Sequence, residues 1–181
     1  IEAFAGTSPN WTDLYRWIAL IDTSTLTASS SIIGATFSIA GNGSAGSPAD
    51  GNNMPMDIGL VSSNPSSNTN IVTGDFSTLG TTAYSNNKPL ATSFVNSAYN
   101  NFPLNADGIA AISKTAITKF GVREWTHDAL GGTPTLVNSA SSYVFVLMAE
   151  NFGTSNDPKL VVTYSFPNFV TPRNPISRPR P

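Results

Sequence analysis

The chain has 181 residues and a mass of 19.0 kDa, which suits one domain with a sizeable core, or a domain plus a tail. Charged residues make up only 11%, against about 25% in typical globular proteins, and a surface of hydroxyls and amides is typical of secreted, surface-layer and virion β-proteins. The absence of cysteine excludes disulfides, thiolate nucleophiles and Cys-ligated metals. No apolar run approaches the ~18 residues of a membrane-spanning helix.

The formal net charge of −2 is unevenly spread. Residues 170–181 hold three arginines and no acid, so the preceding residues carry six basic and eleven acidic groups. A weakly acidic body disfavours a broad phosphate-binding face, and we expect it to have no nucleic-acid partner. The chain starts at Ile1 without a methionine or a signal-peptide pattern. This indicates either a signal that was removed or a part of a longer polypeptide.

Short segments in which apolar and polar residues alternate predict β-strands. In chain order these segments are Glu2–Gly6, Asp13–Asp22, Ile32–Ile39, Met56–Leu60, Leu90–Phe94, Tyr99–Leu104, Thr118–Glu124, Tyr143–Glu150 and Leu160–Phe166. The segment Asp13–Asp22 is apolar at both sets of alternating positions, which favours a central strand covered on both faces.

The last of these segments follows a turn at Asn156, Asp157 and Pro158. Its alternation predicts one buried face, formed by Leu160, Val162, Tyr164 and Phe166. Because it ends the globular part of the chain, we expect it to close a sheet by pairing with a strand that lies much earlier in the sequence.

One short helix is predicted at Asn105–Ser113, with Asn105 as its N-cap and Asp107 in its first turn. A single helical turn around Phe76 is a weaker expectation. Runs rich in Gly, Ser, Asn and Pro predict surface loops at Thr23–Ser31, Gly41–Asn53 and Trp125–Asn138.

Together these elements predict an all-β fold, an antiparallel β-sandwich of about eight to nine strands with one short helix. The sandwich is expected to span residues 1–166. Residues 167–181 are expected to form an extended, polyproline-like arm or linker, because four prolines in residues 172–181 preclude a helix or a central strand.

Several segments resemble DNRLRE-type domains, also called disaggregatase-related repeats. The strand Arg16-Trp-Ile-Ala-Leu-Ile-Asp22, the small polar loop after it and the alternating strand Ile32–Ile39 are similar to the start of those domains. Asn156–Tyr164 is similar to their Asp-Pro-Pro-Lys-Leu-Val-Val-Thr-Tyr ending, and Phe102–Ile112 and Phe120–Glu124 resemble their helical turn and next strand. The resemblance covers most of residues 12–165. It implies a jelly-roll sandwich used as a non-catalytic module of secreted, cell-surface and phage structural proteins, some relatives being carbohydrate-binding modules.

His127, the only histidine, precedes Asp128, and with a serine the pair suggests a hydrolase triad. The Gly-x-Ser-x-Gly elbow that many such enzymes use is missing, which favours a loop histidine held by local hydrogen bonds.

Acids at strand ends are interpreted as turn caps rather than a glycosidase pair. A calcium site built from Asp128, Asn156 and Asp157 is a further hypothesis, since Ca²⁺ prefers oxygen ligands.

Two tryptophans, Trp11 and Trp125, lie in or beside loops, where an exposed indole could stack on a sugar ring. The alternative is that they cover the ends of the sandwich, whereas Trp17 lies in a core-like strand.

The proline-arginine arm is the second interaction hypothesis. Its residues Pro172, Arg173, Arg178 and Arg180 are expected either to contact a neighbouring subunit or to belong to a linker.

We therefore expect a non-enzymatic subunit of an extracellular assembly or virion that associates with itself or with neighbouring structural subunits. No cofactor is predicted apart from the calcium hypothesis. The alternative is a carbohydrate-binding module with a glycan as its partner. An enzyme is the least favoured interpretation.

Overall fold

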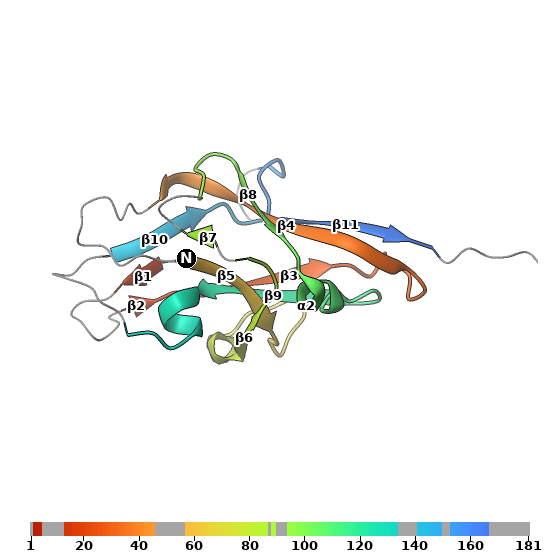
Figure 1. Cartoon of the computed structure of the whole chain (residues 1–181), viewed down its shortest axis with the longest axis horizontal. Helices are drawn as coiled ribbons and strands as arrows, with labels where there is room; N and C mark the ends of the chain where they lie inside the picture. Colours follow the sequence, from red (N-terminus) through yellow and green to blue (C-terminus); the bar gives the residue numbers. More distant parts are fainter. Residues whose placement is uncertain are drawn as a thin grey trace, which may run out of the picture.

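A computed structural model of the chain describes residues 2–4, 13–45, 57–86, 88–89, 94–133, 141–149 and 153–166. These residues form two antiparallel β-sheets packed face to face, which confirms the predicted β-sandwich (Figure 1). The strands are β1 (Glu2–Phe4), β2 (Asp13–Leu14), β3 (Trp17–Asp22), β4 (Ser31–Ala45), β5 (Asp57–Ser63), β6 (Leu79–Ala83), β7 (Lys88–Pro89), β8 (Tyr99–Pro103), β9 (Ile117–Glu124), β10 (Ser141–Val146) and β11 (Lys159–Ser165). The helical turns are η2 (Thr73–Thr78), α2 (Ala106–Ala110) and η3 (Trp125–Ala129).

The first sheet has the strand order β11-β4-β10-β1-β2, and β8 also pairs with β4. The second has the order β3-β9-β5-β6, with β7 on β5. The pairing of β11 with β4, in which Leu160 lies opposite Phe37, confirms that the last strand joins one made much earlier. Within the described ranges, β11 and β2 are therefore the end strands of the first sheet, and β3 and β6 those of the second.

The core lies between the two sheets and centres on three fully buried phenylalanines. Phe37 and Phe102 come from β4 and β8 of the first sheet, and Phe120 comes from β9 of the second. The rings of Phe37 and Phe120 meet edge to face with centroids 5.9 Å apart, and Trp17 of β3 lies 5.8 Å from Phe37. Aromatic pairs of this geometry add to the stabilisation from buried area alone, so these strands fix how the sheets face each other.

The predicted helix is present as the short α2, and its N-cap is confirmed. The side-chain oxygen of Asn105 accepts a hydrogen bond from the backbone N–H of Gly108 at 2.9 Å. The expected helical turn around Phe76 is η2, a 3-10 turn. Its buried Asp75 accepts hydrogen bonds from the backbone N–H groups of Val72 and Ser66, at 2.9 and 3.1 Å. Short polar turns of this kind depend on such caps because they bury little apolar surface.

The prediction of one central strand at Asp13–Asp22 was wrong. The segment divides into β2 and β3, which belong to different sheets, and β3 is an end strand. It is apolar on both sides because one side faces the core and the other lines a groove, described below. Two loop predictions were also too long. β4 continues to Ala45, and Trp125–Ala129 form a π-helical turn.

Burial along β11 also differs from the prediction. Leu160 and Val162 pack against the core, but Tyr164 and Phe166 are 39% and 59% exposed. The alternation correctly places Tyr164 on the same face as Leu160 and Val162. This end of β11, however, extends past the region in which the two sheets cover each other (Figure 1). The predicted strand Leu90–Phe94 falls mostly outside the described residues, as does the whole arm 167–181. In the described part, no helix is long and apolar enough to cross a membrane.

Candidate functional site

A groove runs along β3, the end strand of the second sheet. It consists of two adjoining hollows of about 430 and 560 Å³, which share Trp17, Ile18, Ile71 and Met148 in their linings. The first hollow extends toward Pro158, at the start of β11, and the second toward Arg16 and Phe76. The groove is therefore bordered by residues of both sheets and by the segment that leads into η2.

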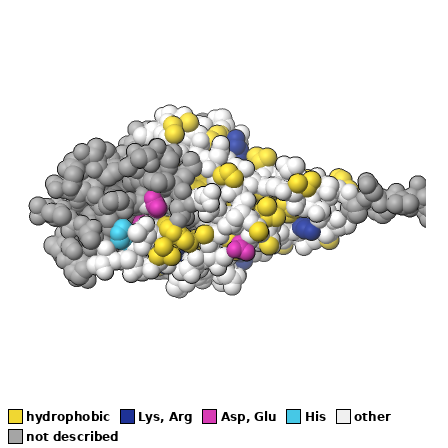
Figure 2. Space-filling model, in the orientation of Figure 1, with side chains coloured by type: hydrophobic (Ala, Val, Ile, Leu, Met, Phe, Trp, Pro, Cys, Tyr) yellow, Lys and Arg dark blue, Asp and Glu magenta, His cyan; other side chains and the backbone are white. Residues whose placement is uncertain are grey.

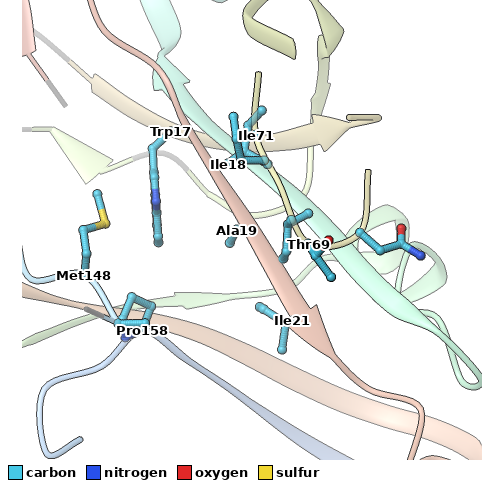
Figure 3. Close-up of a pocket in the computed structure, with 11 residues that line it drawn as sticks. Trp17, Ile18, Ala19, Ile21, Thr69, Ile71, Met148 and Pro158 are labelled. Carbon is cyan, nitrogen blue, oxygen red and sulfur yellow. The ribbon is translucent and has the colours of Figure 1, made fainter. Parts of the chain in front are cut away.

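Alternation along β3 divides the lining into two sides (Figure 3). Trp17, Ala19 and Ile21 extend toward the side on which Met148 and Pro158 lie. Ile18 extends to the opposite side, where Ile71 lies. Asn68 and Thr69 contribute an amide and a hydroxyl beside these apolar groups. The groove can thus take an extended ligand with apolar and hydrogen-bonding groups.

A buried cluster of one acid and two arginines holds one end of this groove in place. The two carboxylate oxygens of Asp128 accept hydrogen bonds from Arg16, at 2.9 and 2.5 Å, and from Arg123, both at 2.7 Å. Arg16 also donates to the carbonyl of Phe76 at 2.7 Å and lies 4.0 Å above its ring. Arg123 donates to the carbonyls of Leu79 and Gly80. The cluster thereby ties β9 and η3 to the wall of the groove.

The pKa of Asp128 depends on the opposing effects of burial and of its two arginine neighbours. Burial opposes its ionisation, but hydrogen bonds from Arg123 and then Arg16, together with their charges, outweigh this and hold the pKa of the carboxyl below its ordinary value. The carboxylate is therefore ionised at neutral pH. Both of its oxygens are already bonded to guanidinium groups, which is the arrangement of a structural tie rather than of a free acid or base.

Glu124 is a residue that sequence reasoning missed. It is fully buried, and its carboxylate accepts hydrogen bonds from the backbone N–H groups of Thr126, His127 and Asp128 at 3.0, 2.6 and 2.8 Å. One of its oxygens also lies 3.1 Å from Nδ1 of His127. The acid beside His127 is thus Glu124 and not the Asp128 of the triad hypothesis. Glu124 directly precedes η3 and is its N-cap, a role that the predicted loop concealed.

Of the two tryptophans predicted to bind glycans, Trp125 is not among the residues that line the groove. Trp125 is half-buried at the start of η3, where its carbonyl accepts a hydrogen bond from the N–H of Leu130 at 3.0 Å. Trp11 lies outside the described residues. The tryptophan that does line the groove is Trp17, which the sequence places in a core-like strand. Alternation along one strand does not reveal that the strand ends its sheet.

The structure describes all three residues of the calcium hypothesis. Asp128 is bonded to two arginines, and the backbone carbonyl of Asp157 accepts a hydrogen bond from the Tyr99 hydroxyl at 3.0 Å. Asn156 is exposed. Within the described ranges, no three His, Cys, Asp or Glu side chains gather where they could hold a metal ion. The arm residues Pro172, Arg173, Arg178 and Arg180 lie outside those ranges.

A second exposed apolar feature is the ribbon formed by residues 31–36 of β4, residues 161–165 of β11 and Phe166 directly after it, called here the β4–β11 ribbon. Ile33 and Val161 are 66% and 55% exposed, in addition to Tyr164 and Phe166. The rings of Tyr164 and Phe166 meet edge to face, 5.4 Å apart. Figure 2 shows hydrophobic side chains exposed along the narrow end of the molecule, where Figure 1 places these two strands. Large apolar side chains that gather in solvent on one pair of strands indicate an interaction site.

Comparisons of the chain with models of protein families, with curated proteins and with solved structures find no match. The resemblance to DNRLRE-type domains therefore remains a prediction that rests on the residues quoted from the sequence.

Proposed function

We propose that the chain is a non-catalytic structural subunit of an extracellular assembly or virion, in which the sandwich is a rigid body that joins neighbouring copies. The β4–β11 ribbon is the observation that carries this proposal. It presents four large apolar side chains to solvent on two adjacent strands: Ile33, Val161, Tyr164 and Phe166.

The energetics of the ribbon favour a partner. Fully burying one large apolar side chain contributes about 1.5–3 kcal/mol, and a two-fold contact covers the same side chains in both copies. Association must also offset lost translational and rotational freedom, estimated at about 4–15 kcal/mol. Burial of several large apolar residues of β11 in both copies is of the right order to do so, whereas burial of a single scattered apolar residue is not.

The contacts of two buried acids, Asp128 and Glu124, also support a structural role. Asp128 joins Arg16 to Arg123, and Glu124 caps η3. Each acid has its oxygens committed to holding neighbouring segments together. Composition supports the location, because a surface poor in charge and rich in hydroxyls and amides is typical of secreted and virion β-proteins.

The arm 167–181 is proposed as a second contact element. In sequence it follows β11 directly, so a neighbour joined at the ribbon would lie close to where the arm begins. Pro172, Arg173, Arg178 and Arg180 are the residues proposed to contact that neighbour. An extended proline-rich segment loses little conformational freedom on binding, which suits it to this role.

The proposal is tested by light scattering of the full chain during gel filtration at increasing concentration, at low and at high salt. Apolar contacts predict a mass that rises with concentration and persists in high salt. A mass equal to one chain at every concentration would overturn the proposal.

A carbohydrate-binding module is the second candidate, and the groove along β3 favours it. Trp17, Asn68 and Thr69 line the same hollow with an indole, an amide and a hydroxyl, groups that suit a sugar ring and its hydroxyls. Pull-down on insoluble polysaccharides tests this. Binding that is lost in Thr69→Ala supports the groove, whereas binding lost in Trp125→Ala or Trp11→Ala supports the tryptophans predicted from the sequence.

A further inference from the structure

We propose that two copies of the chain join by pairing their β11 strands, antiparallel and centred on Val162, so that the first sheet continues from one copy into the other. This inference rests on the proposed function, since it names the surface through which the subunit associates. Its partner is a second copy of the same chain.

Within the described ranges, the outer side of β11 has few of the features that keep end strands apart, and the extra residue of its bulge, Ile33, lies in β4. Natural sheets blunt such strands with charges, prolines, bulges or very short length. β11 has seven residues, and Lys159 is the only charged residue in 159–166, with no proline or glycine among them. Within the described ranges, β4 is its only paired strand. Its outer N–H and C=O groups are therefore suited to receive another strand.

Two other free margins, those of β4 and β3, are less accessible. The outer side of β4 in the ribbon is bordered by the Leu104 N–H, which donates to the Ala35 carbonyl at 2.9 Å, and by Lys114, whose Nζ donates to the Ser30 carbonyl at 2.6 Å. β3 lies within a groove between Ile71 and Met148. β11 instead extends along the outside of the narrow end, past α2 (Figure 1). Among the described residues, no such walls border the outer side of β11, so another sheet can approach it there.

The sequence of β11 is complementary to itself about Val162. Antiparallel pairing centred there overlaps all seven residues and sets Lys159 opposite Ser165, Leu160 opposite Tyr164 and Val161 opposite Thr163. No two like charges face each other, and aromatic and β-branched residues pair with apolar or hydroxyl partners, which stabilises a sheet. Any shift of the register shortens the overlap. The resulting contact has two-fold symmetry, the commonest symmetry of protein assemblies.

Cysteine cross-linking tests this register, and the chain has no cysteine of its own. Residues directly opposite each other lie within reach of a disulfide, while diagonal neighbours, about 7–8 Å apart, lie beyond it. Under mild oxidation, an equal mixture of Val161→Cys and Thr163→Cys is expected to form covalent dimers. Either variant alone is expected to form few, because 161 faces 163 of the other copy and not itself. Cross-linking that is equal in all three samples would overturn the register.

A charge substitution separates this inference from the proposed function. Val161→Lys puts two like charges beside the shared axis and is expected to return the associated chain to one-chain mass. Ile33→Lys is the matched control, because Ile33 is exposed on the adjacent strand β4 and should leave the mass unchanged. Circular dichroism of both variants should match wild type.

Each other outcome has a definite meaning. If the wild-type chain associates and Val161→Lys still associates equally, the contact lies elsewhere, so this inference fails and the proposed function stands. If both lysine variants abolish association, the exposed face and not the β11 margin forms the contact, which also overturns the inference. If the wild-type chain never associates, both fail.

Discussion

Tyr164 lies directly opposite Ile32 across β11 and β4, just beyond an irregularity that follows the pair of Thr163 with Gly34. The extra residue, Ile33, is exposed, Ile32 packs against the core, and Tyr164 is exposed. A bulge of this kind bends the strand and increases its twist. The same two strands therefore belong to the core at one end and form an exposed apolar surface at the other.

Removing an aromatic ring should have opposite consequences at the two ends of these strands. Phe37→Ala is expected to lower the free energy of unfolding by about 3–5 kcal/mol, because Phe37 is fully buried among three other aromatic rings. Phe166→Ala should leave that free energy nearly unchanged and weaken association. Urea denaturation at low protein concentration measures the first effect, and sedimentation measures the second. Equal destabilisation by both variants would show that Phe166 belongs to the core.

Loss of the carboxylate of Asp128 should destabilise the fold. Asp128→Asn keeps the shape but leaves the charges of Arg123 and Arg16 uncompensated in a buried site, and breaking a buried ion pair costs about 3–5 kcal/mol. The control is Asp22→Asn, at an exposed acid, which should change little. Urea denaturation of the two variants makes the comparison. An Asp128→Asn protein as stable as wild type would mean that the cluster contributes no net stability.

The same carboxylate predicts how stability depends on pH. Because the pKa of Asp128 in the folded chain lies below the ordinary 3.8, the unfolded chain binds its proton first as pH falls. Its contribution is therefore fully present above the ordinary pKa and is lost as pH falls from near 3.8 through the lower, folded value. Urea denaturation from pH 7 to pH 2 should show a steep loss in wild type. That loss should be shallower in Asp128→Asn, and identical slopes would contradict the assignment.

Two glycines in strands should respond differently to an added methyl group. A Cβ at Gly121 would lie 2.8 Å from Cδ2 of Leu79 and 3.1 Å from Cγ2 of Val61, so Gly121→Ala should destabilise by about 1–3 kcal/mol through overpacking. At Gly34 no atom lies within 4 Å of that position. Gly34→Ala should be neutral or stabilise by about 0.4–1 kcal/mol, because alanine restricts the unfolded chain. Thermal and urea denaturation test both, and a stable Gly121→Ala protein would contradict the packing described.

Local patterns in the sequence predicted the local structure well. Alternation identified the segments of β3, β4, β5, β8, β9, β10 and β11, at least in part, and Asn105 was correctly expected to cap α2. These features depend on side chains a few residues apart. The period of two decides which side chains share a face, and a short polar side chain before a helical turn satisfies a free N–H.

What the sequence could not provide depends on long-range pairing. Whether β3 is a central or an end strand depends on its neighbours, and nothing within Trp17–Asp22 specifies them. Alternation placed Tyr164 on the face of Leu160 but could not show where the opposing sheet ends. The contact between Arg16 and Asp128 spans 112 residues of sequence. Such contacts form only once the sheets are assembled, so the groove and its buried cluster had no local signal.

Sedimentation velocity of the wild-type chain and of Val161→Lys, side by side over a wide range of concentrations, tests whether copies of the chain associate through β11. We expect wild type to shift from one chain to two or more as concentration rises, while Val161→Lys remains a single chain with an unchanged circular dichroism spectrum. Wild type that sediments as one chain at every concentration would contradict it.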